Sequence, residues 1–137
     1  IIALDIEWEI SAAGAPGNPP ATLKLADGTR VVIFHVLHGQ GSVPGELPDP
    51  LAELLEDTKL TKTGVGIMGD CTRLTTLYGV KVAHAVNLRS LAVERNVELG
   101  LRRGLADFCV HLLGQQFQKN PSVRLSKWNK SNLSDDQ

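Results

Sequence analysis

Apolar and polar residues alternate at the start of the chain, and this pattern predicts a strand over residues 1–9. Its isoleucines and leucine are typical of a buried strand, but Asp5 and Glu7 interrupt the apolar run. Because side chains alternate along a strand, the two carboxylates point to the same face, roughly 6–7 Å apart along the backbone. The first strand therefore presents a pair of acids on one of its faces.

This pair of acids needs a positive partner, because an ionised carboxylate rarely stays unpaired away from water. A divalent metal ion or a close Lys or Arg would provide one. Residues 1–20 contain no Lys or Arg, and this favours the metal ion. The alternative is that Asp5 and Glu7 lie at a solvated strand end and have no chemical role.

The next part of the chain predicts a hairpin between two loops. Residues 21–25 and 30–36 have the composition of strands, and Ala26-Asp27-Gly28-Thr29 between them is a turn sequence. Residues 14–20 and 37–48 are rich in Gly and Pro, which predicts loops on either side.

From residue 49 onward, helical and strand patterns alternate. Asp49 as N-cap and Pro50 at the first helical position predict a helix with a leucine stripe at 51, 54 and 55. The further predictions are a strand at 62–68, a helix ending at Gly79, a strand at 80–86, a helix at 88–93, an amphipathic helix at 105–113 ended by Gly114, and the opening of another helix at 131–137.

The predicted order of elements is β-β-β-α-β-α-β-α-α, which is typical of the α/β class. Three closely joined strands form an antiparallel meander most simply, and the alternation that follows predicts a mixed sheet with helices on its faces. With 137 residues, we expect a single domain over residues 1–137. The chain starts without Met in a core strand, so we expect an excerpt or a processed form.

Composition excludes several classes of protein. No run of about 18 apolar residues occurs, so no membrane span is predicted. Cys71 and Cys109 lack paired spacing and are expected to be reduced thiols. His35 and His38 have no second ligand at helical spacing, so we expect surface or core histidines and not metal ligands. An intracellular location, nuclear or cytoplasmic, is expected.

The net charge of −1 conceals an asymmetry. Residues 1–57 contain nine acidic residues against Lys24 and Arg30, whereas residues 58–137 contain twelve basic and six acidic residues. An acidic region beside a basic one suits a metal site next to a polyanion groove. Ordinary surface solubility produces the same asymmetry, so it supports either interpretation.

Asp70 is the third candidate acid, and it follows a predicted strand at or near a helix N-terminus. An acid there complements the helix dipole and can act as a cap. If its strand lies beside the first one, Asp70 comes close to Asp5 and Glu7. Three converging carboxylates suit Mg²⁺ or Mn²⁺, and two such ions about 3.5–4 Å apart can assist the displacement at a phosphodiester.

These residues carry a resemblance to a known family. Residues 4–8, Leu-Asp-Ile-Glu-Trp, resemble the first motif (Asp-x-Glu) of the DEDD superfamily of 3′–5′ exonucleases. Residues 62–74 resemble the second motif, in the form found in exonuclease domains like that of the Werner syndrome helicase. Residues 105–114, 123–128 and 133–137 look like the segment that leads into the third motif. The resemblance covers nearly the whole chain.

The resemblance implies a ribonuclease H-like fold, with an antiparallel three-strand meander plus two parallel strands, flanked by helices. It also implies metal-dependent hydrolysis of DNA or RNA from a single-stranded 3′ end. Under it, Asp5, Glu7 and Asp70 are the catalytic metal ligands for two Mg²⁺ or Mn²⁺ ions.

The same resemblance suggests residues that bind the substrate. Trp8 would pack against the terminal nucleotide, although a core position is favoured for it. Arg124, Lys127 and Lys130 would contact phosphates, or else form a solvated face. Trp128 lies in a polar run and is expected to anchor its loop to the body.

Two departures from the tyrosine-type branch of the family matter. A tyrosine and a fourth aspartate follow the glutamine aligned with Gln137 in that branch, and this chain ends at Gln137. We therefore expect a domain truncated at its C-terminal end that hydrolyses poorly or not at all. Asn87 stands where many relatives carry an aspartate that is not a metal ligand.

The alternative function is a catalytically inactive nuclease-fold module that binds nucleic acid or a protein partner. Retention of three acids that repel one another and phosphate favours an active parent protein, with additional domains or partners possible. A pure scaffold would bind no metal.

Overall fold

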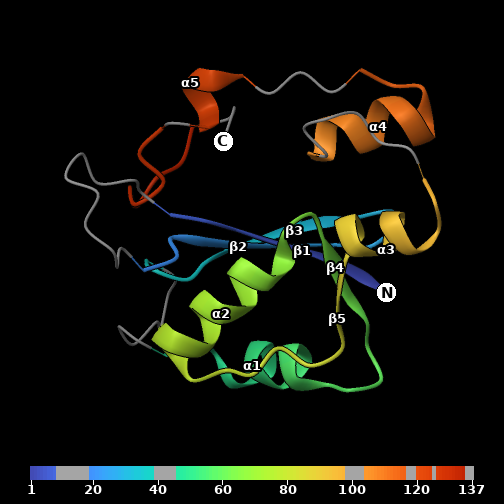
Figure 1. The fold of residues 1–137 in the computed structure, drawn as a ribbon. Helices are drawn as coiled ribbons and strands as arrows, with labels where there is room; N and C mark the ends of the chain where they lie inside the picture. The colour runs from blue at the N-terminus through green and yellow to red at the C-terminus, as the bar shows by residue number, and fades with distance from the viewer. Residues whose placement is uncertain (9–18, 39–45, 98–103, 117–119, 125, 135–137) are drawn as a thin grey trace.

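Strand β1 lies at the centre of a five-stranded mixed sheet with the order β3-β2-β1-β4-β5 (Figure 1). The computed structural model describes residues 1–8, 19–38, 46–97, 104–116, 120–124 and 126–134. The strands are β1 (Ile2–Glu7), β2 (Thr22–Ala26), β3 (Val31–His35), β4 (Lys62–Gly64) and β5 (Ala85–Asn87). This arrangement confirms the predicted α/β class, the antiparallel meander and the two added parallel strands.

The meander has a register that follows the predicted alternation. β1 pairs with β2 so that Asp5 lies opposite Lys24 and Glu7 lies opposite Thr22. The turn between β2 and β3 is closed by Asp27, whose carboxylate accepts hydrogen bonds from the backbone N–H groups of Thr29 and Arg30 at 2.8 Å each. These hydrogen bonds, those from Thr29 first, hold the pKa of Asp27 well below its usual range.

The parallel part of the sheet is short, and two glycines lie where it ends. β4 pairs with β1 only at Ile2–Lys62 and Ala3–Thr63. At Gly64 the backbones approach so closely that a Cβ atom would lie 2.7 Å from the carbonyl oxygen of Leu4. Gly66 then adopts a φ of 81°, a left-handed conformation that favours glycine, and the chain turns into a helix.

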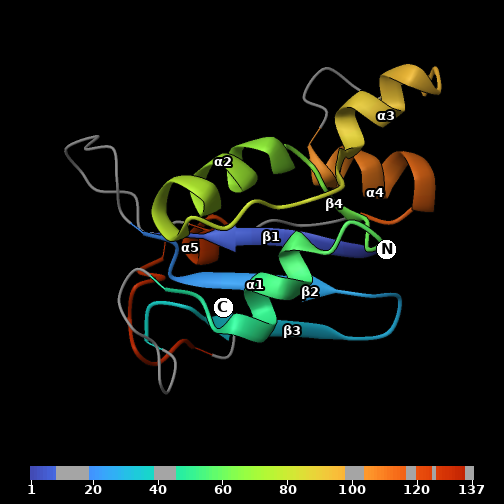
Figure 2. The same ribbon diagram turned by 90° about the horizontal axis from the view of Figure 1, so that it is seen from below.

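The helices occupy both sides of the sheet (Figures 1 and 2). α1 (Asp49–Glu56) and α2 (Ile67–Tyr78) cover one face, whereas α4 (Leu105–Leu113) and the short α5 (Pro121–Arg124) lie on the other side. α3 (Leu88–Glu94) follows β5 at the edge of the sheet. No helix among the described residues is long and apolar enough to cross a bilayer.

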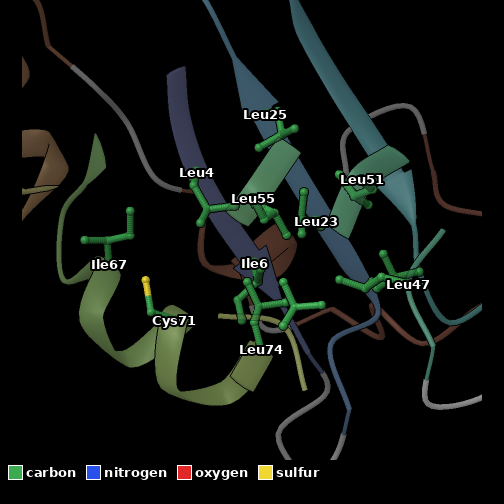
Figure 3. Packing of buried hydrophobic residues seen from close by; sticks show 12 residues of the cluster. Leu4, Ile6, Leu23, Leu25, Leu47, Leu51, Leu55, Ile67, Cys71 and Leu74 are labelled. Carbon is green, nitrogen blue, oxygen red and sulfur yellow. The ribbon is translucent and has the colours of Figure 1, made fainter. Parts of the chain in front are cut away.

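The core lies between the sheet and the helices α1 and α2, and we call this side the core face (Figure 3). Leu4 and Ile6 of β1 and Leu23 and Leu25 of β2 point toward these helices, as the period of two predicts. The helices contribute buried side chains from residues 51 and 55 of α1 and residues 67, 71 and 74 of α2.

The opposite face of the sheet carries the alternate residues of the same strands, and we call it the acid face. Asp5 and Glu7 of β1 and Lys24 of β2 lie on it, together with Val31 and Ile33 of β3, which are 68% and 45% exposed. Only Phe108 is buried in α4, whose Leu105, Leu112 and Leu113 are exposed. The amphipathic pattern of this helix therefore does not correspond to a buried stripe among the described residues.

Two predicted strands are shorter in the structure than the apolar pattern indicated. The strand predicted at 62–68 ends at Gly64, and Ile67 and Met68 belong to α2. The strand predicted at 80–86 is reduced to β5, because the preceding segment bonds to α1 instead: the N–H of Ala83 donates to the carbonyl of Leu55 at 3.0 Å. His84, with a φ of 52°, separates this segment from the strand.

Three further predictions needed correction or lie beyond the described residues. Asp49 is the first residue of α1, and the N-cap is Pro48. Residues 131–134 are not helical, and 135–137 lie outside the described residues, as do most of the loop predicted at 14–20 and residues 39–45 of the second loop. The four-residue α5 carried no signal in the apolar pattern.

Candidate active site

Asp5 and Glu7 form the first part of the candidate site, on the acid face at the carboxyl end of β1. Their side chains are 61% and 28% exposed, so Glu7 is the more enclosed of the two. Leu4, which precedes Asp5, and Ile6, which lies between the two acids, are buried on the core face. Burial of these two neighbours fixes the acids on the opposite side of the strand.

Asp70 enters the site from the first turn of α2. The pairing of β4 with β1 ends at Thr63, and α2 therefore begins beside the second half of β1. The amide of Asn87 fixes this start, because its Oδ1 accepts the N–H of Gly66 and the N–H of Arg89, each at 3.1 Å. The helix has Gly66 at its N-cap and no side-chain cap, so Asp70 is not a capping residue.

The electrostatics of Asp70 reflect the nearness of the other two acids. Burial, followed by the negative charges of Asp5 and Glu7, raises the pKa of Asp70 to about 7 against the opposing charge of Arg73. Burial, followed by the charge of Asp70, also raises the pKa of the Cys71 thiol. The charge of Asp70 is therefore coupled to the charges of Asp5 and Glu7.

Lys24 is the positive partner of Asp5 and Glu7. It lies outside residues 1–20, which contain no basic residue. Its Nζ lies 3.1 Å from Oε1 of Glu7 and 3.6 Å from Oδ2 of Asp5. The inference that a metal ion is favoured because no basic residue is near was therefore incomplete. The lysine comes from the neighbouring strand, where the antiparallel register places it opposite Asp5.

The donor set fits a hard divalent cation in its chemistry. Asp5, Glu7 and Asp70 offer carboxylate oxygens, which are the ligands that Mg²⁺ and Mn²⁺ prefer. The hydroxyl of Thr22, on the strand position opposite Glu7, is buried and has no hydrogen-bond partner among the described residues. In the described part of the chain, however, no three His, Cys, Asp or Glu side chains are gathered as a ready metal site.

Trp8 directly follows Glu7 in the sequence, and the structure shows two contacts of its ring. Its half-buried ring packs against the hydrophobic core. The guanidinium of Arg73 lies 4.1 Å from the centroid of the same ring, a cation–π arrangement. Arg73 is one helical turn after Asp70, so it connects Trp8 to the first turn of α2.

Residues 126–130, which we call the basic loop, lie against the same site. Trp128 is 2% exposed, which confirms that it anchors its loop, and Nζ of Lys24 lies 4.4 Å from the centroid of its ring. His38 strengthens this anchor by donating from Nε2 to the carbonyl of Asn129 at 2.6 Å. The exposed Lys127 precedes Trp128 directly.

The other basic candidates are placed less fully. Lys130 is exposed beyond Trp128. The backbone of Arg124 ends α5, and its side chain lies outside the described part of the structure.

Two residues of the site were missed by the sequence analysis. Arg73 could have been found, because it follows Asp70 at the i, i+3 spacing that brings helical side chains together. Lys24 could not, because the long connection between β1 and β2 leaves their register open.

Comparison with protein families places these features in a known group. A family model described as 3′-5′ exonuclease matches residues 1–137. A 3′-5′ exonuclease of Arabidopsis thaliana is 31% identical over 131 residues, which are 93% of this chain and 42% of that protein. The bifunctional 3′-5′ exonuclease/ATP-dependent helicase WRN of Mus musculus is 29% identical over 138 residues, covering the whole chain and 9% of that protein.

Solved structures show the same fold. The EXD2 exonuclease domain, in crystals soaked with Mg and GMP, superposes with a TM-score of 0.59 at 28% identity, over 99% of this chain and 66% of that one. Brucella melitensis NrnC bound to pGG gives a TM-score of 0.76 at 19% identity, over 99% and 61% of the two chains. The chain thus spans less than two thirds of the length of each of these proteins.

Proposed function

Because the chain belongs to the 3′-5′ exonuclease family, we propose that it hydrolyses nucleic-acid phosphodiesters from a single-stranded 3′ end with the help of divalent metal ions. The main support is the electrostatic interaction of Asp70, in the first turn of α2, with Asp5 and Glu7 of β1. Neither helix capping nor core packing requires Asp70 to be there. Three mutually repelling acids are costly unless a cation joins them.

The ligands of the metal ions would be Asp5, Glu7 and Asp70. Bound Mg²⁺ or Mn²⁺ supplies Lewis-acid activation and neutralises the charge that develops on the phosphate oxygens. The protein holds the carboxylates in position through the buried neighbours of Asp5 on β1 and through the hydrogen bonds of Asn87 at the start of α2. Metal soaks of the EXD2 exonuclease domain with Mg and with Mn are consistent with this choice of ions.

The substrate would approach across Trp8 and the basic loop. Lys127 is exposed beside the anchored Trp128 and would contact the phosphate backbone without reading sequence. Trp8 would offer the uncovered part of its ring to the terminal base, while Arg73 holds the ring in place. Arg124 would contribute a second phosphate contact at the end of α5. The soak of the EXD2 exonuclease domain with GMP is consistent with a nucleotide substrate for this chain.

The test measures shortening of a 5′-labelled single-stranded oligonucleotide in Mn²⁺ or Mg²⁺. We expect slow removal of nucleotides from the 3′ end, abolished by EDTA and by Asp5→Asn or Asp70→Asn. Asp49→Asn is the matched control, because Asp49 is also an aspartate in the first turn of a helix but lies in α1. This control should keep the activity of the unmodified protein.

Two results would contradict the proposal. Shortening that persists in EDTA would remove the role of the metal ions. Shortening that persists in Asp5→Asn or Asp70→Asn, with circular dichroism showing the fold intact, would remove these residues from the metal site.

A further inference from the structure

Lys24 is the one cation whose ammonium group contacts both acids of β1 among the described residues. It lies in the middle of β2, opposite Asp5 in the register, and its side chain is only 22% exposed. The hydrogen bond to Oε1 of Glu7 measures 3.1 Å. Two of the three carboxylates proposed as metal ligands are thus already shared with a positive charge of the protein itself.

The second neighbour of Lys24 is an aromatic ring. Its Nζ lies 4.4 Å from the centroid of the Trp128 ring, which is buried. An ammonium group over an aromatic face is attracted by the ring quadrupole. The ammonium therefore keeps a favourable contact when its bonds to the carboxylates are broken.

An ammonium group and a divalent ion compete for the same oxygens. A lone pair of Glu7 that accepts the N–H of Lys24 is not free to coordinate Mg²⁺ or Mn²⁺ at about 2.1 Å. Two cations bound to one carboxylate pair also repel each other. Without a metal ion, however, three neighbouring acids need a counter-charge, and Lys24 is placed to give it to Asp5 and Glu7.

We propose that Lys24 is a built-in competitor for the metal ion, which neutralises Asp5 and Glu7 in the metal-free protein and is displaced toward the Trp128 ring when a divalent cation binds. This inference rests on the proposed metal site. It makes Lys24 a positioning residue that sets the metal affinity. Substitution of Lys24 should change this affinity in the opposite direction to substitution of a residue that supports the metal site. Removal of a competitor strengthens metal binding, whereas removal of a support weakens it.

The experiment measures the dissociation constant for Mn²⁺ from the loss of the free-ion signal in electron paramagnetic resonance. Lys24→Met keeps an aliphatic stem against Trp128 and removes the ammonium, and Lys24→Gln is a second neutral variant. We expect Mn²⁺ to bind about threefold to tenfold more tightly to both, the range for losing one or two partly exposed ion pairs. Lys24→Arg, which keeps the charge, should stay within about twofold of the unmodified protein.

Lys59→Gln is the matched control for loss of one positive charge. Lys59 is exposed in the connection from α1 to β4, beside the opposite end of β1. It should leave Mn²⁺ affinity within about twofold. Circular dichroism on all variants verifies that each is folded.

The outcomes separate the two proposals. Unchanged or weaker Mn²⁺ binding in folded Lys24→Met and Lys24→Gln, with binding by the unmodified protein, would overturn the role of Lys24 alone. An equal strengthening in Lys59→Gln would reduce the effect to net charge and overturn it too. If the unmodified protein and both neutral variants bind no Mn²⁺, the proposed metal site fails and the role of Lys24 with it.

Discussion

The two faces of the sheet each contain one enclosed lysine, and the two lysines have opposite relations to their surroundings. Lys62, on the core face, is fully buried, and its Nζ donates to the backbone carbonyl of Asp57 at 2.6 Å. Lys24, on the acid face, contacts two carboxylates and an aromatic ring. Lys62 donates a hydrogen bond to a backbone carbonyl at the end of α1. The carboxylates that Lys24 contacts are, in contrast, also proposed to bind the metal ion.

This difference separates structural from functional charge. On the core face the charge of Lys62 is desolvated, and burial lowers its pKa, partly offset by Asp57. The other buried side chains on that face are apolar and stabilise the fold. On the acid face like charges are held together at positions that contribute little to packing. Proteins commonly carry such unfavourable clusters where a ligand is to be bound.

The largest contrast is expected between matched isoleucines on the two faces. Ile67 is fully buried against the core face, whereas Ile33 on the acid face is 45% exposed. Ile67→Ala should lower the free energy of unfolding by about 2–5 kcal/mol, and Ile33→Ala by less than about 1 kcal/mol. Urea denaturation followed by circular dichroism measures both. Equal losses would mean that the acid face is also packed.

Gly64→Ala tests how the sheet positions Asp70. The added Cβ would lie 2.7 Å from the carbonyl oxygen of Leu4, so β4 must move away from β1 at a cost of about 1–3 kcal/mol. Mn²⁺ binding should weaken as well, because α2 begins three residues later. Gly69→Ala is the control: open space surrounds it within α2, and it should stabilise the protein by up to about 1 kcal/mol. Similar destabilisation by both would contradict the close-approach explanation.

The pH dependence of the free energy of unfolding should show that the buried charge of Lys62 destabilises the folded protein. Below its lowered pKa in the folded protein, Lys62 is protonated in both states, and the full cost of burying the charge is present. Between that pKa and the ordinary value of 10.5 the unfolded chain binds more protons, so this residue makes stability rise with pH.

Lys62→Met removes this titrating group while keeping the aliphatic stem. We therefore expect the unmodified protein to gain stability relative to Lys62→Met as the pH rises toward 10.5. Urea denaturation at several alkaline pH values measures this, with the exposed Lys59→Met as control. A difference that stays constant over this range would show that the charge of Lys62 costs nothing in the folded protein.

The smallest effect is expected for the ion pairs of Lys24 in the absence of metal. Asp5 is 61% exposed, and pairs of this kind contribute little to stability. In EDTA, Lys24→Gln should lower the free energy of unfolding by less than about 1 kcal/mol. A loss of several kcal/mol would make Lys24 a structural residue, comparable to Lys62, and erase the contrast between the faces.

Local pattern predicted the meander and most helices, because alternation in β1 and the leucine spacing of α1 depend on a few neighbouring residues. It overestimated the strands at 62–68 and 80–86. Apolar residues such as Ile67 and Val80 are buried in both cases, but a helix start and an irregular segment bury them as well as a strand does. Short apolar runs do not distinguish these outcomes.

The sequence by itself determined that Asp5 and Glu7 share one face of a strand, that Asp70 begins a helix, and that the chain resembles a nuclease family. These properties depend on spacing along the chain. Only the tertiary structure decided that Lys24 lies between the acids and Trp128, because strand register and long-range packing bring together residues more than one hundred positions apart.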